Sequence, residues 1–476
     1  MICKVKNYIK YIRGIIWAIL PISAKQKALF QYKWRMLHVL RYLRRDVSLD
    51  MRRELEKEYK NAYSAKTREA FEKRARDIKK KYKKIHILRN NILNIGPLCY
   101  IYYLLREFLE DCPVNEKVVF FLYDGDRPVY VMSDSRISNQ WLLSKIRESV
   151  EVIDQDTAPF WGYFLKKYET LCTLDNLDDV GRILHLNRAL ILHKENYDYP
   201  SRRLLCFSDP EKQYGENVLK KMGIKRGAYF CFFSRNNEYH EEYFNNHGTH
   251  QAMLTKRRNS SVDTFVQAIT SVPFLDIKAV RVGAVDSRKV DGRNILDYTN
   301  TYRDEFLDFF IMSEAKFFVG DDSGVVFIPW LLNIPQAITN NFSFFWRGSI
   351  KFNYNSKMNL TIFKKWWDRD KKRYLTLREI LNLSWEYGIT DEMELDLYSK
   401  LGIEFHSNTS EEIADLIYEM NLRIEGRWKD DNEMRQLREK YWTMINAAVK
   451  RSNPVIVLWD YEPGSLFLKK NKWLLD

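Results

Sequence analysis

The chain has 476 residues, of which 45% are hydrophobic and 14% are aromatic. This length exceeds the roughly 250–300 residues at which one hydrophobic core stops growing, so at least two domains are expected, and the composition excludes a globally disordered chain. The formal net charge of +14 is concentrated at the start, because residues 1–90 hold 26 Lys and Arg against 8 Asp and Glu.

The first 45 residues predict an uncleaved membrane-surface segment. The apolar run 14–22 is shorter than the roughly 20 residues of a bilayer span and is interrupted by Pro21. Residues 25–45 alternate basic side chains with Phe30, Trp34 and leucines at helical spacing. A basic amphipathic helix of this kind suits an anionic membrane interface, although packing on the chain's own domain is the alternative.

Residues 47–85 predict a long charged helix with two apolar stripes that are out of register. A helical hairpin and a dimer contact are both open, and the latter implies a homo-oligomer. We therefore expect residues 1–90 to form a basic helical extension. The six cysteines are scattered without metal-site spacing, which favours reduced thiols and a cytoplasmic location.

From about residue 86, short apolar runs alternate with amphipathic segments. Strands are expected at 87–95, 117–123 and 150–154, with helices at 98–109 and 137–148. Alternating strands and helices predict a parallel sheet that is covered on both faces, and we assign this first lobe to residues 91–223.

A second series of the same kind follows a helix at 215–223. Its expected strands are 228–234, 278–282 and 316–319, and its expected helices are 262–270 and 302–313. We assign this lobe to residues 224–430, with a C-terminal helix and tail at 431–476. The sequence thus predicts an α/β protein with two doubly wound lobes and a ligand between them.

The segment KFFVGDDSGVVFIPWLLNIP, residues 316–335, predicts a buried strand, a turn and a helix at 325–332. Free backbone N–H groups at the start of such a helix favour anions. We expect Ser323 and Gly324 to meet the phosphates of a ligand, and Asp321 and Asp322 to cap the helix or accept hydrogen bonds from ligand hydroxyls.

Two arginines extend this anion site. Arg235 stands where the strand 228–234 ends, and Arg258 and Asn259 precede the helix 262–270. A guanidinium can hold a phosphate through two parallel hydrogen bonds, so the two arginines and the helix start predict a diphosphate cradle.

From about residue 90 onward the chain resembles a bacterial glycosyltransferase family of GT-B fold that is associated with surface-polysaccharide gene clusters. In the first lobe the resemblance rests on the segment ISNQWLL, and at the end of the chain on the segment FLKKNKWLL. In the second lobe it is carried by Arg235, Arg258, Asn259, Arg281, Gly283, Asp297, Tyr298, Asp308, Ser323, Gly324 and Pro335.

This resemblance implies transfer of a sugar from a nucleotide-sugar donor in the C-terminal lobe to an acceptor in the N-terminal lobe. It implies a lipid-linked or surface glycan as acceptor, and neither a metal nor a cofactor, since the nucleotide sugar is a co-substrate. Asp124 and Asp126, in the turn after the strand 117–123, are candidates for the base. The expected donor-binding residues are Arg235, Asn236, Glu238, His240, Arg258, Asn259, Asp297, Tyr298, Asp321, Asp322, Ser323 and Gly324.

Other functions have weaker support in the sequence. The histidines at 240, 247 and 250 match no metal motif and suggest a flexible loop over the ligand. An NAD-dependent oxidoreductase would need a GxGxxG motif opening a helix, and the sequence has none. A nucleic-acid-associated protein that uses the basic N-terminal arm is the alternative. The leading expectation is a cytoplasmic glycosyltransferase at the inner membrane surface.

Overall fold

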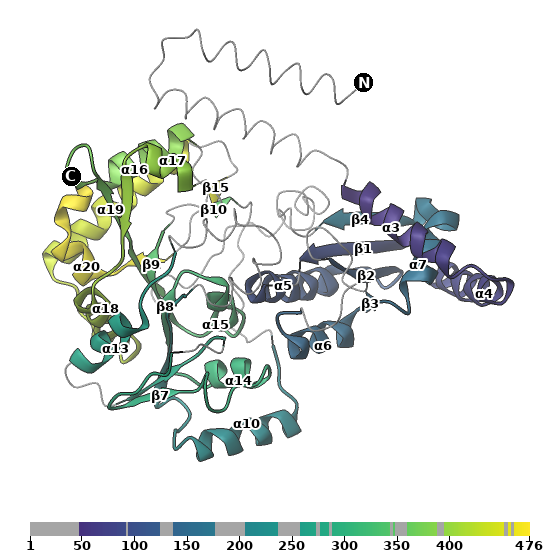
Figure 1. Cartoon of the computed structure of the whole chain (residues 1–476), viewed down its shortest axis with the longest axis horizontal. Helices are drawn as coiled ribbons and strands as arrows, with labels where there is room; N and C mark the ends of the chain where they lie inside the picture. The colour runs from purple at the N-terminus through teal and green to yellow at the C-terminus, as the bar shows by residue number, and fades with distance from the viewer. Residues whose placement is uncertain are drawn as a thin grey trace, which may run out of the picture.

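The computed structural model describes residues 47–91, 94–123, 137–176, 205–236, 258–272, 277–284, 288–342, 346–347, 359–387, 395–451, 456–457 and 461–476. They form two α/β lobes, each built on a parallel sheet with helices on both faces (Figure 1). The expected two-lobed α/β architecture is therefore confirmed. The helix predicted at 25–45 lies outside the described residues.

The first lobe contains a four-stranded sheet in the order β3-β2-β1-β4, with every pair parallel. Its strands are β1 (Lys84–Asn91), β2 (Glu116–Tyr123), β3 (Glu151–Ile153) and β4 (Cys172–Asn176). Along β2, Val118 and Phe120 face the core that contains α5 (Ile95–Asp111) and α6 (Gln140–Ser149), whereas Val119 and Phe121 face the opposite core. An unbroken apolar run is what a strand buried on both faces requires.

The segment before β1 forms α3 (Val47–Asn61) and α4 (Ala65–Lys81). Both helices pack against α7 (Ala158–Tyr168), and α7 leads through η3 (Glu169–Leu171) into β4. Leu55 and Tyr59 are buried there, and a Cβ on Gly162 of α7 would lie 1.8 Å from the Leu55 carbonyl oxygen. The two apolar stripes are out of register because Ser64 caps a second helix. Residues 47–81 are thus a hairpin within the first lobe, and the stripes that suggested a dimer contact are buried in the chain itself.

The second lobe contains a seven-stranded sheet in the order β16-β11-β9-β8-β5-β6-β7, again with every pair parallel. The strands are β5 (Tyr229–Phe233), β6 (Lys278–Arg281), β7 (Ile295–Asp297), β8 (Phe318–Asp321), β9 (Gln336–Asn341), β11 (Asn359–Phe363) and β16 (Glu462–Pro463). One face carries α10 (Asp209–Lys221), α14 (Leu307–Ser313) and α15 (Phe327–Leu331). The other carries α13 (Val262–Ser271), α18 (Ser410–Ile424), α19 (Asn432–Arg451) and α20 (Ser465–Lys470).

Two expected helices are shorter than their sequence patterns indicated. The helix expected at 302–313 begins at Leu307, whose N–H donates to the Asp304 carboxylate (2.7 Å) in the turn that precedes the helix. The helix expected at 325–332 is a 3-10 turn, η4 (Gly324–Val326), followed by α15. Pro329 lies inside α15 and has no N–H to donate to the Val325 carbonyl, so the α-helical hydrogen bonds do not extend back to Val325.

The two lobes share one hydrophobic core. Tyr103 of α5 and Trp330 of α15 pack edge to face with their ring centroids 4.8 Å apart. Next to them, Gly96 at the start of α5 touches Gly324 at the start of η4, and a Cβ on Gly96 would lie 2.9 Å from the Gly324 Cα. The carboxylate of Glu305 in the second lobe accepts hydrogen bonds from the first backbone N–H groups of α6. The lobes are therefore joined by close backbone contact as well as by side chains.

Small elements complete the second lobe. The strands β12 (Lys365–Asp368), β13 (Arg373–Tyr374) and β14 (Ile403–His406) form an antiparallel sheet in the order β13-β12-β14. A separate antiparallel pair joins β10 (Trp346–Arg347) to β15 (Ile456–Val457). The remaining elements are α16 (Leu377–Tyr387), α17 (Leu395–Lys400) and η6 (Lys472–Leu475).

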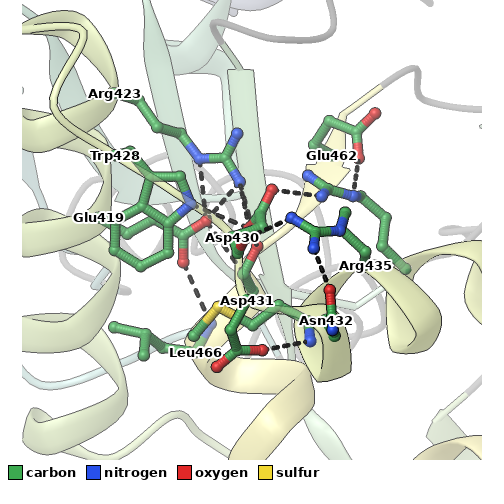
Figure 2. Close-up of polar contacts among 12 residues, drawn as sticks. Glu419, Arg423, Trp428, Asp430, Asp431, Asn432, Arg435, Glu462 and Leu466 are labelled. Atoms are coloured by element: carbon green, nitrogen blue, oxygen red, sulfur yellow. Dashed lines mark hydrogen bonds and ion pairs between the residues drawn. The ribbon is translucent and has the colours of Figure 1, made fainter.

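A buried polar network fastens the C-terminal segment to the second lobe (Figure 2). Glu419 of α18 is 0% exposed, and its carboxylate accepts hydrogen bonds from the backbone N–H groups of Ser465 (3.1 Å) and Leu466 (3.2 Å). Arg423 donates to the same carboxylate at 2.8 Å. A negative charge at the start of α20 stabilises that helix. The C-terminal segment FLKKNKWLL, residues 467–475, therefore has a structural role. It begins in α20, which follows the edge strand β16 and is held by Glu419.

Candidate functional site

The polar residues of the second lobe gather at the carboxyl edge of its sheet. Arg235 follows β5, Asp321 ends β8, Asn340 and Asn341 end β9, and Lys364 follows β11. Because these four strands are parallel neighbours, their carboxyl ends meet at one edge, which is where open α/β sheets bind ligands. The segment before α13 and the segment before α18 border the same edge through hydrogen bonds to these residues.

Asp321 lies at the centre of this edge and is 0% exposed. One carboxylate oxygen accepts from the Arg235 N–H (2.7 Å) and the Ser260 hydroxyl, and the other accepts from the Thr339 hydroxyl (2.9 Å) and the Asn340 amide (2.6 Å). Burial raises the pKa of Asp321, and these hydrogen bonds oppose that shift. With four donors already bound, the carboxylate organises the site, and the expectation that it meets ligand hydroxyls is wrong.

Lys364 is a charged residue of the site that the sequence analysis missed. It is 3% exposed, and its ammonium donates to the Asn259 carbonyl (3.0 Å) and the Ser407 hydroxyl (3.0 Å). Burial lowers the pKa of Lys364 to about 8, the charge of Asp321 acts to raise it, and that of Arg235 lowers it further. The signal in the sequence is a lysine directly after the buried strand NLTIF.

The structure brings the two predicted arginines to this same edge. Arg235 is 5% exposed, and its backbone carbonyl accepts from the Ser260 N–H (3.0 Å). Arg258 donates to the Asp322 carbonyl (3.0 Å) and pairs with the Asp322 carboxylate (3.3 Å). Asn236 directly follows Arg235 and is partly buried. Through its carboxylate, Asp322 therefore neutralises part of the charge of Arg258.

Ser323 and Gly324 begin the short helical segment after β8. The Ser323 side chain accepts from the Val325 N–H (3.3 Å), so Ser323, rather than either aspartate, is the cap. Gly324 is placed against Gly96 of the first lobe, where a Cβ on Gly324 would lie 3.1 Å from the Gly96 nitrogen. The missing side chain of Gly324 therefore has a packing role between the lobes, and η4 presents a weaker dipole than the expected longer helix.

Asp297 is the last residue of β7, the edge strand of the second sheet, and β6 and β5 separate β7 from the strand β8 that carries Asp321. Burial acts to raise the pKa of Asp297, but hydrogen bonds from Thr299, Asn300 and the Val290 N–H, together with the charge of Arg281, lower it overall. The Arg281 guanidinium lies 3.4 Å from the Asp297 carboxylate. These contacts stay within the protein and fix the turn after β7.

Tyr298 is buried in the core shared by the lobes and is 0% exposed. Its hydroxyl donates to the Asp308 carboxylate (3.1 Å), which also accepts from Arg303 (3.1 Å). Burial raises the pKa of Asp308 to about 7. The expectation that Tyr298 contacts the donor is therefore wrong, because its hydroxyl is bonded inside the core.

Four of the predicted site residues, Asp124, Asp126, Glu238 and His240, lie outside the described residues. The strand β2 ends at Tyr123, so Asp124 directly follows the carboxyl end of the first sheet. Within the described ranges, no cluster of three or more His, Cys, Asp or Glu has the arrangement of a metal site. Among those same residues, no helix is both long and apolar enough to cross a membrane.

No protein-family model and no curated protein matches the chain. Among solved structures, Escherichia coli ADP-heptose LPS heptosyltransferase II is similar over 59% of this chain and 90% of its own, at 11% identity and a TM-score of 0.38. A glycosyl transferase family 9 protein from Veillonella parvula DSM 2008 is similar over 67% of this chain and 97% of its own, at 10% identity and a TM-score of 0.35.

Proposed function

We propose that this protein is a glycosyltransferase that uses a nucleotide-sugar donor. The observation that carries the proposal is the set of three basic residues, Arg235, Arg258 and Lys364, held at the carboxyl edge of one parallel sheet. Two aspartates, Asp321 and Asp322, offset part of that charge. A site with net positive charge at this edge suits a diphosphate, and the resemblance noted in the sequence supplies the sugar.

In the proposed reaction, an acceptor hydroxyl attacks the anomeric carbon of the donor sugar. The bond from that carbon to the diphosphate oxygen breaks, and the electron pair stays on the departing oxygen. The basic residues at the site stabilise this developing negative charge, which is the usual task of preorganised cations in group transfer. A carboxylate takes the proton of the acceptor hydroxyl.

For that base we propose Asp124 or Asp126, which follow β2 at the carboxyl end of the first sheet. Asp124→Asn and Asp126→Asn are tested separately for transfer and for donor binding. The base variant loses at least about a hundredfold in turnover and retains donor binding. Full turnover in both variants rejects both residues.

We further propose that the acceptor is a lipid-linked or surface glycan and that the protein works at the cytoplasmic face of the inner membrane. Residues 1–45 supply 11 Lys and Arg together with an apolar run and tryptophans, a combination that suits an anionic bilayer surface. Removal of residues 1–45 should lower vesicle association, and unchanged association would exclude this role.

A thermal-shift screen of nucleotide sugars tests the proposed activity. A ligand at about 100 times its dissociation constant stabilises the folded state by roughly 2.7 kcal/mol. We expect one nucleoside diphosphate or sugar nucleotide to raise the melting temperature, and Arg235→Ala to abolish that increase. Arg427→Ala, which removes a guanidinium from an exposed side chain, is the matched control. The absence of any shift across the screen contradicts the proposal.

A further inference from the structure

A second basic region lies at the opposite end of the first sheet from the carboxyl edge. Residues 73–84, the end of α4 and the start of β1, hold eight Lys and Arg and one acid, Asp77, a net charge of +7. Lys79, Lys80, Lys81 and Lys83 are exposed. Among the described residues, no carboxylate pairs with any of these four lysines. This density of unpaired positive charge attracts anionic partners.

An exposed apolar side chain lies beside these lysines. Val114, in the turn between α5 and β2, is 96% exposed. The turn is tied to the basic segment, because the Lys83 N–H donates to the Asn115 carbonyl at 2.7 Å. The turn therefore places an apolar side chain directly beside positive charge, a combination that suits a membrane interface.

One aromatic ring and two acidic residues lie near the exposed lysines. The ring of Tyr82 lies under two ammonium groups, with Lys81 Nζ 5.2 Å and Lys117 Nζ 5.6 Å from its centroid. The nearby acids are engaged elsewhere, Glu116 with His86 at 2.6 Å and Glu151 with Lys117 at 3.1 Å. They leave the four exposed lysines uncompensated.

We propose that this amino-edge surface, defined as residues 79–84 with Val114, docks on an anionic lipid bilayer. The lysines meet lipid phosphates, while Val114 and the ring of Tyr82 enter the headgroup boundary, where amphipathic side chains are favoured. Lipid is preferred over nucleic acid because the exposed valine gains free energy in a bilayer boundary and gains nothing from a phosphate backbone.

The surface is independent of the proposed donor site. It lies at the amino ends of β1 and β2, and the eight residues of β1 place about 25 Å between the two edges of the sheet. Substitution at the surface therefore leaves the nucleotide-sugar thermal shift unchanged, so a failure of this inference and a failure of the proposed activity give different results.

Sedimentation of the full-length protein with phosphatidylglycerol or phosphatidylcholine vesicles tests the inference. The combined variant K79Q/K80Q/K81Q/K83Q should lose on the order of a hundredfold in partitioning onto phosphatidylglycerol. Val114→Asn should lose several-fold. Wild-type protein should bind phosphatidylcholine only weakly.

The matched control is K220Q/K221Q/K225Q/K429Q, which removes four exposed lysines from other surfaces and should leave partitioning within about twofold of wild type. Equal losses in both combined variants, or none in the first, overturn the inference. Loss of affinity for a single-stranded oligonucleotide with unchanged vesicle binding overturns it in favour of nucleic acid.

Discussion

Buried charges define the donor edge of this protein at the scale of single residues. A fully buried carboxylate is stable only when hydrogen bonds and a nearby positive charge replace its lost water. Asp321 has four donors, and Lys364 and Arg235 lie close enough to influence each other's charge. The same contacts bind Arg235 to Ser260, so the arginine backbone is fixed before any ligand arrives.

Asp321→Asn should destabilise the fold by about 3 kcal/mol. One carboxylate oxygen becomes an NH₂ group, which would face donors from Arg235 and Ser260 or from the β9 side chains. Chemical denaturation measures the change. Asp322→Asn is the control and should cost less, because the Asn amide oxygen and the main-chain carbonyl of residue 322 can still accept from Arg258. Equal losses would show that Asp321 does not organise the edge.

Lys364 should make diphosphate binding depend on pH. Its pKa is lowered from 10.5 to about 8, so its ammonium is charged below about pH 8 and neutral above it. Calorimetric affinity for a nucleoside diphosphate should fall roughly tenfold as pH rises from 7 to 9.5, since a charged hydrogen-bonding partner is lost. Lys364→Met should bind weakly at both pH values, and an unchanged pH profile in this variant would exclude Lys364 as the cause.

At the scale of elements, the apolar pattern located β1, β2, β3, β5, β6 and β8, whose side chains are buried on both faces, but it missed β4 of the first sheet and β7, β9, β11 and β16 of the second. The strands β5 and β8 differ from the expected ranges by at most two residues. The pattern does not show what an apolar stripe packs against, so the α3–α4 hairpin was expected outside the first lobe. The helices α14 and α15 are shorter than expected, and the local causes lie at Asp304 and Pro329, which an apolar pattern does not weigh. Lys364 was missed because a lysine after a strand is usually exposed.

The contact between Glu305 and α6 is the clearest case of one lobe completing a helix of the other. Glu305→Ala should cost about 1–2 kcal/mol, because two N–H groups of α6 lose their acceptor and the helix dipole loses a negative charge. Thermal denaturation measures the loss. Glu148→Ala, on the exposed side of the same helix, should change stability by less than about 0.5 kcal/mol.

At the scale of the whole molecule, the common core couples the lobes. Two lobes of this size often unfold separately, but here one hydrophobic cluster contains residues of both sheets. Calorimetry should therefore show a single transition. Gly96→Val should lower the temperature of that transition, because the added atoms meet the backbone of Gly324. Gly292→Ala should lower it less, because the added atom meets only the movable end of the Ile295 side chain. Two separated transitions in the unmodified protein would contradict this coupling.

The packing of Leu55 against Gly162 also orders events during synthesis. Helix α3 leaves the ribosome about a hundred residues before α7, so its apolar face has no native surface to cover it until residue 162 has been made. In that interval the apolar face of α3 is open to a chaperone or another temporary surface. The first lobe thus closes late in its own translation, at a time set by sequence distance rather than by helix stability.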